Sequence, residues 1–331
     1  MIDLPLPGTA HLLYVLFLAV AFDLFIGEPP TKLHPVVWIG NLITFLERIS
    51  PDSHRKLYGV FLGLACITFT GLVAWVVLMI SASALVPGFV SLLLEAYLLK
   101  STFAIRRLLH AGSEVYEQLD RGDIVEGRKR LSMYVSRDTS SLSEEQVSSS
   151  VMETVSENYV DSILTPLFFY SIAGPFGLVA AYAFKAVSTL DSMVGYMDEK
   201  HIDIGFFSAK LDDVLNWIPA RASVIYIMAA SSLLKLFEDT NGLSPAGAFR
   251  CARGDCARPS SPNSGFPMAA VAGALQVRLE KPGTYVIGDN YSAPMAADII
   301  KVCRIIAVAS ILSVIVFSLT IYIIGELTRY S

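Results

Sequence analysis

The sequence predicts an all-α, polytopic helical integral membrane protein with a polar helical region on its cytoplasmic side. Of the 331 residues, 53% are hydrophobic and only 17% are charged, whereas soluble domains carry about 25% charged residues. The mean hydropathy is +0.55, and several apolar runs approach the roughly 20 residues that cross a bilayer. The formal net charge is −5 and there is no Lys/Arg-rich block. We therefore expect the lipid bilayer, and no nucleic acid, among the partners.

Four apolar segments are expected to cross the membrane, namely residues 11–26, 57–80, 85–99 and 303–325. Asp23 interrupts the first of them, and Glu95 lies within the third. An acid inside a span is costly and usually faces protein or water. Glu95 is therefore either a functional group or a paired structural one.

Two further apolar segments are ambiguous. Residues 163–184 carry Gly174-Pro175 in their middle, so they form either one kinked span or two half-helices of a re-entrant hairpin. Residues 222–237 are short for a span and are diluted by serines. Neither segment is assigned as a crossing, because a crossing at both would separate the polar motifs between the two sides of the membrane.

Basic residues set the expected orientation, since cytoplasmic loops carry an excess of Lys and Arg. The loop 27–56 carries four of them and residues 100–159 carry eight, whereas the turn 81–88 carries none. The expected organisation is an N-terminal part with the first spans and the loop 27–56 (residues 1–99), a cytoplasmic-face region with the re-entrant segments (100–302) and a last span (303–331).

Three acids in the cytoplasmic-face region suggest a metal site. Glu153, Glu157 and Asp161 are spaced i, i+4 and i+8, so they share one face of a helix. Ser143 and Gln146 form a capping box that would begin this helix. The acids have no basic partner one turn away and should repel one another, unless Mg²⁺ bound to substrate phosphates fills the gap. A solvated acidic face is the alternative.

Several cations and amides accompany these acids. Arg137-Asp138-Thr139 offers an anion site or an ordinary helix cap. Lys185 suits a phosphate or an interfacial lysine. The remaining polar residues that attract attention are Asn158, Asp191, Asp212, Asp213, Asn216 and Arg221.

No Walker A pattern, Gly-x-Gly-x-x-Gly or Ser-His-Asp signature is present, and Cys251 and Cys256 lack the second pair that a zinc site needs. The residues alone therefore predict a Mg²⁺-dependent enzyme that acts on a phosphorylated substrate at the cytoplasmic membrane face, and they do not specify the reaction.

Several blocks of sequence, in one order, resemble a known family. The blocks are Asp23-Leu24 with Gly27-Glu28-Pro29 and His34-Pro35-Val36; Arg137-Asp138-Thr139; Glu153-Thr154 with Glu157-Asn158 and Asp161; Pro166-Leu167-Phe168; residues 189–196; Leu211-Asp212-Asp213 with Asn216 and residues 218–221; and Ser261-Pro262-Asn263-Ser264-Gly265 with residues 272–275. They resemble the cobalamin biosynthesis proteins CobD/CbiB, the adenosylcobinamide-phosphate synthase family.

The resemblance implies an ATP-dependent carbon–nitrogen ligase of cobalamin (vitamin B12) biosynthesis, with Mg²⁺ as cofactor and ATP as co-substrate. It would join adenosylcobyric acid to 1-aminopropan-2-ol or its O-phosphate, giving adenosylcobinamide or its phosphate. It would be a multi-pass protein of the cytoplasmic membrane with its active side in the cytoplasm. Association with other membrane enzymes of nucleotide-loop assembly is a further expectation.

The resemblance also suggests roles for individual residues. Metal and general-base roles would fall to Glu153, Glu157, Asp161 and Asp191, with Glu153, Glu157 and Asp191 as the metal ligands. The substrate- and phosphate-binding set would be His34, Arg137, Asp138, Thr139, Asn158, Lys185, Asp213, Asn216, Arg221 and Asn263.

The chain departs from the family pattern at Ser136, at Ser188 and at Met268, where the family usually has Gly, Asn and Glu. Two other classes of function compete with the ligase. A transporter or binding protein for a corrinoid or small anion would be expected to show more spans and an inverted repeat. A phosphotransferase of lipid head groups would be expected to show a compact acidic motif within one span.

Overall fold

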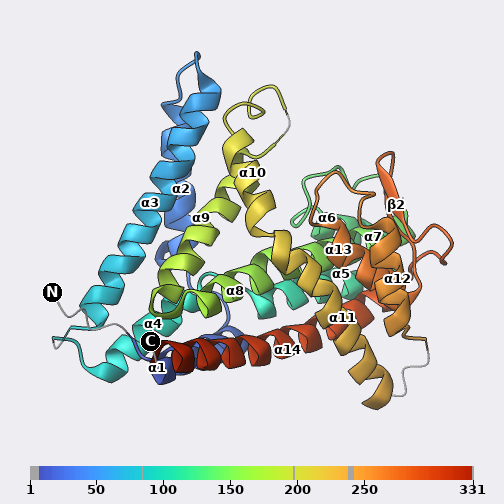
Figure 1. Cartoon of the computed structure of the whole chain (residues 1–331). Coiled ribbons are helices and arrows are strands. Elements are labelled where there is room, and N and C mark those ends of the chain that lie inside the picture. The colour runs from blue at the N-terminus through green and yellow to red at the C-terminus, as the bar shows by residue number, and fades with distance from the viewer. Residues whose placement is uncertain (1–6, 84, 197, 238–241, 330–331) are drawn as a thin grey trace. The chain divides into compact units, whose positions relative to one another are not determined.

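The computed structural model describes residues 7–83, 85–196, 198–237 and 242–329 (Figure 1). The chain forms two compact units. Unit 1 comprises Met1–Ala104, Thr165–Leu215 and Val314–Ser331, and unit 2 comprises Ile105–Leu164 and Asn216–Ser313. The three consecutive parts expected from the sequence therefore do not coincide with these units, because each unit combines segments that are distant in sequence.

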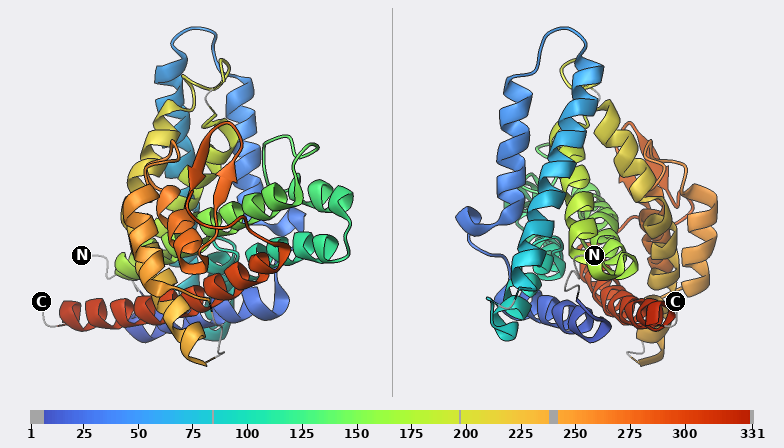
Figure 2. Two further views of the ribbon diagram at one scale, coloured as in Figure 1. Left: turned by 90° about the vertical axis from the view of Figure 1, so that its right-hand side faces the viewer. Right: turned by 60° about the vertical axis from the view of Figure 1, so that its left-hand side comes forward.

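The described residues of unit 1 form helices and the loops that connect them, without a strand. Its helices are α1 (Thr9–Ala21), α2 (Pro35–Arg48), α3 (Arg55–Ser81), α4 (Gly88–Lys100), α8 (Thr165–Ile172), α9 (Gly177–Val194) and α10 (Phe206–Leu215), together with the end of α14 (Ala296–Arg329). A π-helical turn, Phe22–Ile26, extends α1. The helices α2 and α3 lie side by side, as Figure 2 shows, and both also pack on α9.

Unit 2 combines helices with one hairpin. Its elements are α5 (Ile105–Asp120), α6 (Ile124–Leu131), α7 (Glu144–Tyr159), α11 (Trp217–Phe237), α12 (Pro245–Asp255), α13 (Gly265–Leu275), β1 (Leu279–Lys281), β2 (Tyr285–Ile287) and the start of α14. The strands β1 and β2 pair antiparallel. The predicted all-α class is confirmed, with this short hairpin as a local exception that the sequence analysis did not anticipate.

Among the described residues, four helices are long and apolar enough to cross a membrane: Thr9–Ile26, α3, α11 and α14. Three of them confirm the segments expected at 11–26, 57–80 and 303–325. The chain is thus a polytopic helical membrane protein. A fifth crossing results if α4 and α5, which are separated by a short break, count as one broken span.

Two of the sequence-based expectations about spans are corrected. The helix α4 has 13 residues, so the segment 85–99 does not reach span length by itself. Conversely, residues 222–237 belong to α11, which begins at Trp217 and has 21 residues. The interpretation of this segment as too short was wrong, because the turn that carries Arg221 also belongs to the helix.

Residues 163–184 do not form one kinked span. The helix α8 ends at Ile172, and α9 begins at Gly177 and packs back against α8. Gly174 has φ +56°, a left-handed conformation that glycine adopts without strain, and Pro175 follows it. Of the two alternatives predicted from the sequence, the structure has the two separate helices.

Glu95 is a paired residue. Its Oε2 atom lies 2.9 Å from His11 Nε2, and its Oε1 atom accepts a 2.5 Å hydrogen bond from the Ser81 hydroxyl. The carboxyl group is buried among α1, α3 and α4. This is the structural alternative of the two that the sequence allowed.

The helix α7 begins as predicted. The Ser143 hydroxyl accepts a hydrogen bond from the Gln146 amide, and the Gln146 side chain accepts one from the Ser143 amide. The hairpin packs on this helix, where the Ser149 hydroxyl accepts a 2.6 Å hydrogen bond from the Glu280 amide. Two-stranded hairpins are marginal by themselves, so α7 is the support that orders it.

Candidate functional site

The predicted site residues are distributed over both units. Unit 1 holds His34, Lys185, Asp191 and Asp213, and unit 2 holds Arg137, Asp138, Thr139, Glu153, Glu157, Asn158, Asp161, Asn216, Arg221 and Asn263. Within each unit the structure brings some of them into contact, and these groups are described separately.

The centre of unit 2 is an ion pair between Arg137 and Glu153. The Arg137 Nη2 atom donates a 2.6 Å hydrogen bond to Glu153 Oε2, and the Glu153 side chain is only 2% exposed. Glu153 projects from the middle of α7. Arg137 comes from the loop before α7, which is fixed where the Thr139 hydroxyl donates to the Arg128 carbonyl and Arg128 Nε donates to the Leu142 carbonyl. The pair therefore joins two rigidly held segments.

This ion pair is incompletely satisfied. Both Glu153 Oε1 and Arg137 Nη1 are buried and make no well-formed hydrogen bond to the described residues. Buried polar atoms without partners are rare, because each costs about 1–3 kcal/mol or more. One unfilled acceptor beside one unfilled donor is the arrangement expected where a ligand binds.

The hairpin contributes two further groups. Burial raises the pKa of Glu153, and the opposing effects of Arg137, Lys281 and the Tyr285 hydroxyl are smaller in sum. Burial, together with the charges of Glu153 and Glu157, raises the pKa of Tyr285. A carboxyl group with a raised pKa is suited to act as a general base near neutral pH.

Sequence reasoning missed Lys281 and Tyr285, because neither belongs to a motif or to a periodic pattern. The Tyr285 hydroxyl also lies 3.8 Å from the sulfur of Met268, to which it donates a weak hydrogen bond. Met268 is buried. Met268, which stands where the family usually has Glu, thus lies next to this cluster.

The row of three acids is less regular than its spacing predicts. Glu153 and Glu157 lie on α7, but Asp161 lies in a π-helical turn, Val160–Leu164, where the helical period changes. The Asn158 side-chain amide donates a hydrogen bond to the Thr154 carbonyl. The expectation that one α-helical face carries all three acids is therefore met only for Glu153 and Glu157, and the basic partner of Glu153 comes from the preceding loop.

Arg221 and Asn263 also meet in unit 2. The Arg221 guanidinium lies between two aromatic rings, with its carbon 4.0 Å from the Trp217 ring centroid and 4.4 Å from that of Phe266. Its Nη1 atom donates to the Trp217 carbonyl at 2.8 Å and to Asn263 Oδ1 at 3.5 Å. Contact with both rings restricts the guanidinium, and its Nε and Nη2 atoms remain as donors for an anion.

Asp138 and Thr139 are used within the loop. The Asp138 carboxylate accepts hydrogen bonds from the Ser140 amide and hydroxyl, and the Thr139 hydroxyl is bonded to Arg128. These contacts shape the loop that positions Arg137. Their predicted substrate-binding roles remain predictions.

Asp191 and Asp213 interact in unit 1. Burial and the nearby charge of Asp213 raise the pKa of Asp191. Lys210 lies 3.2 Å from Asp213, and Lys185 lies half-buried on α9. A carboxyl group whose ionisation is disfavoured by a neighbouring carboxylate suits a divalent cation, since Mg²⁺ is commonly held by one or two carboxylates and substrate phosphates.

No group of three or more His, Cys, Asp or Glu side chains in the described part of the chain is arranged to hold a metal ion. Glu153 fits Mg²⁺ poorly because Arg137 already occupies one carboxylate oxygen. The pair of Asp191 and Asp213 fits better. Mg²⁺ binding by any of these residues stays a prediction.

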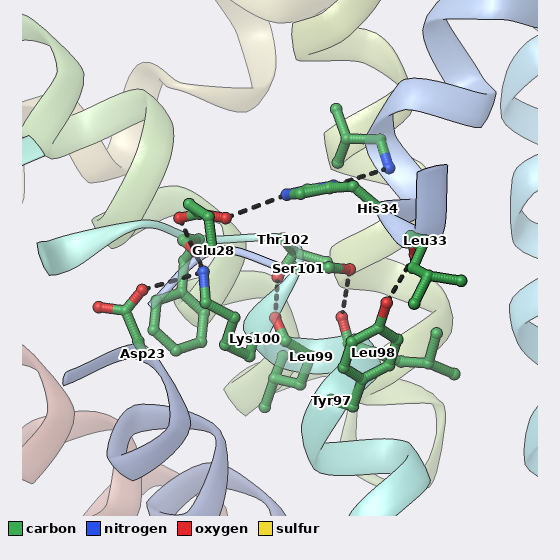
Figure 3. Close-up of polar contacts among 12 residues, drawn as sticks. Asp23, Glu28, Leu33, His34, Tyr97, Leu98, Leu99, Lys100, Ser101 and Thr102 are labelled. Carbon is green, nitrogen blue, oxygen red and sulfur yellow. Dashed lines mark hydrogen bonds and ion pairs between the residues drawn. The ribbon is translucent and has the colours of Figure 1, made fainter. Parts of the chain in front are cut away.

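A second buried charge network holds the loop between α1 and α2 in unit 1 (Figure 3). The Lys100 ammonium lies 3.1 Å from Asp23 Oδ1 and 2.8 Å from Glu28 Oε1, and the Lys100 and Asp23 side chains are 2% and 0% exposed. The Tyr97 hydroxyl donates to the Leu33 carbonyl. The end of α4 is thereby tied to both sides of the loop.

His34 is committed within this network. Its Nε2 atom lies 3.0 Å from Glu28 Oε2, and its Nδ1 atom accepts a hydrogen bond from the Val36 amide at the start of α2. Since Nδ1 accepts, Nε2 carries the proton and donates to Glu28. Burial opposes ionisation of Glu28, yet His34 and Lys100 together lower its pKa. Both ring nitrogens are engaged, so the predicted role of His34 in substrate binding gains no support here.

The network also contains three residues that were not assigned to the site from the sequence: Asp23, Glu28 and Lys100. The sequence does show a charged residue near the end of each of two apolar segments, Asp23 in residues 11–26 and Lys100 directly after residues 85–99. Neighbouring ends of antiparallel helices bring such charges together, but sequence alone does not say which ends are neighbours.

The fold and these clusters define a class: a polytopic helical membrane protein with buried, paired charges in each of its two units. A family model described as "CobD/Cbib protein" matches residues 16–315. The chain belongs to this family, which confirms the resemblance drawn from the motifs.

Named relatives match over most of their length. A probable cobalamin biosynthesis protein CobD of Methanothermobacter thermautotrophicus is 42% identical over 283 residues, covering 83% of this chain and 86% of the relative. A cobalamin biosynthesis protein CbiB of Salmonella typhimurium is 39% identical over 309 residues, covering 89% and 93%. A probable CobD of Methanothrix thermoacetophila is 39% identical over 325 residues, covering 94% and 97%. No solved structure matches the chain.

Replacing Lys100 should destabilise the protein. Lys100→Ala leaves the buried Asp23 carboxylate and the partly exposed Glu28 carboxylate without their cation, for which we expect a loss of about 3–5 kcal/mol. The matched control is Lys32→Ala, at an exposed lysine in the same loop, with an expected change within about 0.5 kcal/mol. Thermal unfolding in detergent measures both variants. Equal melting temperatures for the two would show that the network contributes nothing to stability.

The stability contributed by Glu153 should fall as pH rises. Its pKa is raised above the ordinary value of 4.5, so within that window the folded protein binds more protons than the unfolded chain, and deprotonation favours unfolding. Compared with Glu153→Gln, the wild type should lose melting temperature as pH increases from about 4.5 through the raised pKa. Glu144→Gln, at an exposed acid of the same helix, should show no such trend. The opposite slope for Glu153 would mean that Arg137 outweighs burial.

Proposed function

We propose that the protein is a ligase of cobalamin biosynthesis. It would join adenosylcobyric acid to 1-aminopropan-2-ol O-phosphate, or to aminopropanol, in a reaction that consumes ATP and requires Mg²⁺. Membership of the CobD/CbiB family and the names of the relatives support a role in cobalamin biosynthesis. The structural observation that carries the finer proposal is the buried Arg137–Glu153 pair with its unfilled acceptor and donor.

The reaction sets three chemical tasks. The carboxylate of the corrinoid must first take the terminal phosphoryl group of ATP, with release of ADP. The amine then attacks the resulting acyl phosphate: a carbon–nitrogen bond forms, the carbon–oxygen bond to phosphate breaks, and inorganic phosphate leaves. The attacking ammonium group must lose protons in the process. The protein must therefore hold phosphates, stabilise charge on their oxygens and accept a proton.

Glu153 suits the proton-accepting task. An ammonium group is unreactive until it is deprotonated, and a buried carboxylate with a raised pKa is a stronger base than an exposed one. The Glu153 Oε1 atom makes no well-formed bond to the described residues, so it can accept a hydrogen bond from the amine. Arg137, held by Glu153 Oε2, keeps Nη1 for a negatively charged oxygen.

Arg221 suits the phosphate-holding task. Its guanidinium is fixed between Trp217 and Phe266, so little conformational entropy is lost when it binds an anion. Asn263 bonds its Nη1 atom and restricts its rotation. Lys185 remains a further candidate for phosphate.

Asp191 and Asp213 are the residues proposed to hold Mg²⁺. When bound, Mg²⁺ neutralises charge on phosphoryl oxygens and makes phosphorus more susceptible to attack. The raised pKa of Asp191 beside Asp213 supports this assignment. Glu157 is retained as a further metal-binding candidate, on its sequence position alone.

We also propose that the protein lies in the cytoplasmic membrane with its active side in the cytoplasm. The distribution of Lys and Arg supports this when α4 and α5 cross as one broken span, because loop 27–56 and the basic residues that follow α5 then lie on the same side. A cytoplasmic active side gives access to ATP. Other membrane enzymes that act on the same corrinoid would be natural neighbours.

A product assay tests the proposed function. Purified protein in detergent receives ATP, Mg²⁺, adenosylcobyric acid and aminopropanol phosphate, and mass spectrometry should find adenosylcobinamide phosphate together with ADP. Glu153→Gln should lower the rate about 10²- to 10⁴-fold, whereas Glu144→Gln should not. ADP release without a change in corrinoid mass, or bound corrinoid without turnover, would favour a transporter or binding protein instead.

Asp191→Asn should weaken Mg²⁺ binding. Removing one carboxylate charge from the pair should raise the Mg²⁺ concentration for half-maximal activity by at least about tenfold. The melting temperature should not fall. Asp52→Asn, at an exposed acid in unit 1, is the control. An unchanged Mg²⁺ dependence in Asp191→Asn would remove Asp191 from the metal site.

A further inference from the structure

An apolar cavity of about 140 Å³ lies in unit 1, among α2, α3, α4 and α9. Six of its lining residues determine its shape and polarity: Trp38 on α2, Phe69, Thr70, Val73 and Ala74 on α3, and Tyr182 on α9. None of these residues belongs to the clusters assigned to the reaction, so the cavity is separate from the proposed chemistry of the protein.

The cavity is not suited to water. Trp38, Thr70 and Tyr182 are the lining residues with a polar side-chain group. The Trp38 indole is bonded to the Lys32 carbonyl, and the Tyr182 hydroxyl is bonded to the Ser101 hydroxyl at 2.6 Å and to the Leu98 carbonyl at 3.1 Å. A buried water needs two to four polar partners, and an apolar cavity of about 150 Å³ stays dry and binds benzene. A hydrocarbon group is therefore the favoured occupant.

One side of the cavity is open and lined by exposed apolar side chains. Trp38, Phe69 and Val73 are 54%, 56% and 45% exposed, whereas Thr70 and Ala74 at the inner end are buried. The Trp38 indole donates a 3.0 Å hydrogen bond to the Lys32 carbonyl, which fixes the ring at the mouth. The cavity is thus a crevice that leads from an apolar surface to a buried end.

The position along α3 places this crevice at the depth of lipid tails. The helix is a candidate span, and no charged residue follows Lys56 in it. At 1.5 Å per residue, Phe69 to Val77 lie about 20–30 Å beyond Lys56 and within the remaining uncharged stretch. With a hydrocarbon core of about 30 Å, these residues lie within the layer of acyl chains when α3 crosses.

We propose that this crevice binds the acyl chain of one membrane phospholipid. The chain end fills the space between α2, α3 and α9, and Trp38 covers it at the mouth. The bound lipid replaces side-chain packing that is missing between α2 and the middle of α3, so it acts as a structural part of unit 1.

Intrinsic fluorescence tests this proposal, since the chain has three tryptophans. Trp38 alone, in the double variant Trp75→Phe/Trp217→Phe, reports on the crevice. Trp75 alone, in Trp38→Phe/Trp217→Phe, reports on the outer surface of α3. Phosphatidylcholine with brominated acyl chains is titrated into each protein in detergent. Quenching of Trp38 should saturate at about one lipid per protein, whereas quenching of Trp75 should rise in proportion to bulk lipid.

Filling the crevice supplies the matched comparison. In the Trp38 reporter, Ala74→Phe should abolish saturable quenching, and Val76→Phe, at an exposed position of the same helix, should leave it unchanged. Melting temperatures show whether Ala74→Phe has folded. Quenching of Trp38 that never saturates in the unfilled reporter overturns the proposal irrespective of that variant, as does saturable quenching that survives Ala74→Phe. If quenching of Trp38 instead decreases as the protein concentration rises, a second copy of the chain covers this surface, and the proposal is overturned.

Discussion

The structure depends on how charged side chains are buried away from water. Moving an ion into a low-dielectric interior costs several kcal/mol, and only a close counter-ion with further hydrogen bonds offsets this cost. Lys100 sits between Asp23 and Glu28, Glu95 contacts His11 and Ser81, and Glu153 contacts Arg137. The pairs of Lys100 with Glu28 and of Glu95 with His11 join segments that are distant in sequence, so each of them also fixes a tertiary contact. The pair of Arg137 and Glu153 joins α7 to the loop before it.

The cations of these pairs differ in how completely their donors are satisfied. The Lys100 ammonium is within reach of two carboxylates and of the Phe103 carbonyl, which matches its three donors. The pair of Arg137 and Glu153 keeps one buried atom unfilled on each side. The cation of the Lys100 network is therefore fully engaged, whereas that of the Arg137–Glu153 pair keeps one buried donor for a ligand.

Patterns within single helices were predictable from the sequence. Apolar length predicted Thr9–Ile26, α3 and α14, the capping box predicted the start of α7, and Gly174-Pro175 predicted either a kink or a break before α9. The partners of buried charges were not predictable, because Lys100 and Asp23, or Glu153 and Tyr285, meet only through tertiary packing. The π-helical turn that carries Asp161 was not predictable either, since such a turn has no simple signature in sequence.

The hairpin is attached to α7 through Glu280, so the state of the Glu280 amide shows whether the hairpin is in contact with α7. The Ser149 hydroxyl both accepts from the Glu280 amide and donates to the Glu280 carbonyl, and Glu280 lies between Leu279 and Lys281 on β1. The hairpin that carries Lys281 and Tyr285 can separate from Glu153 only if this amide is released. The rate of hydrogen–deuterium exchange at Glu280 therefore measures how often this part of unit 2 opens.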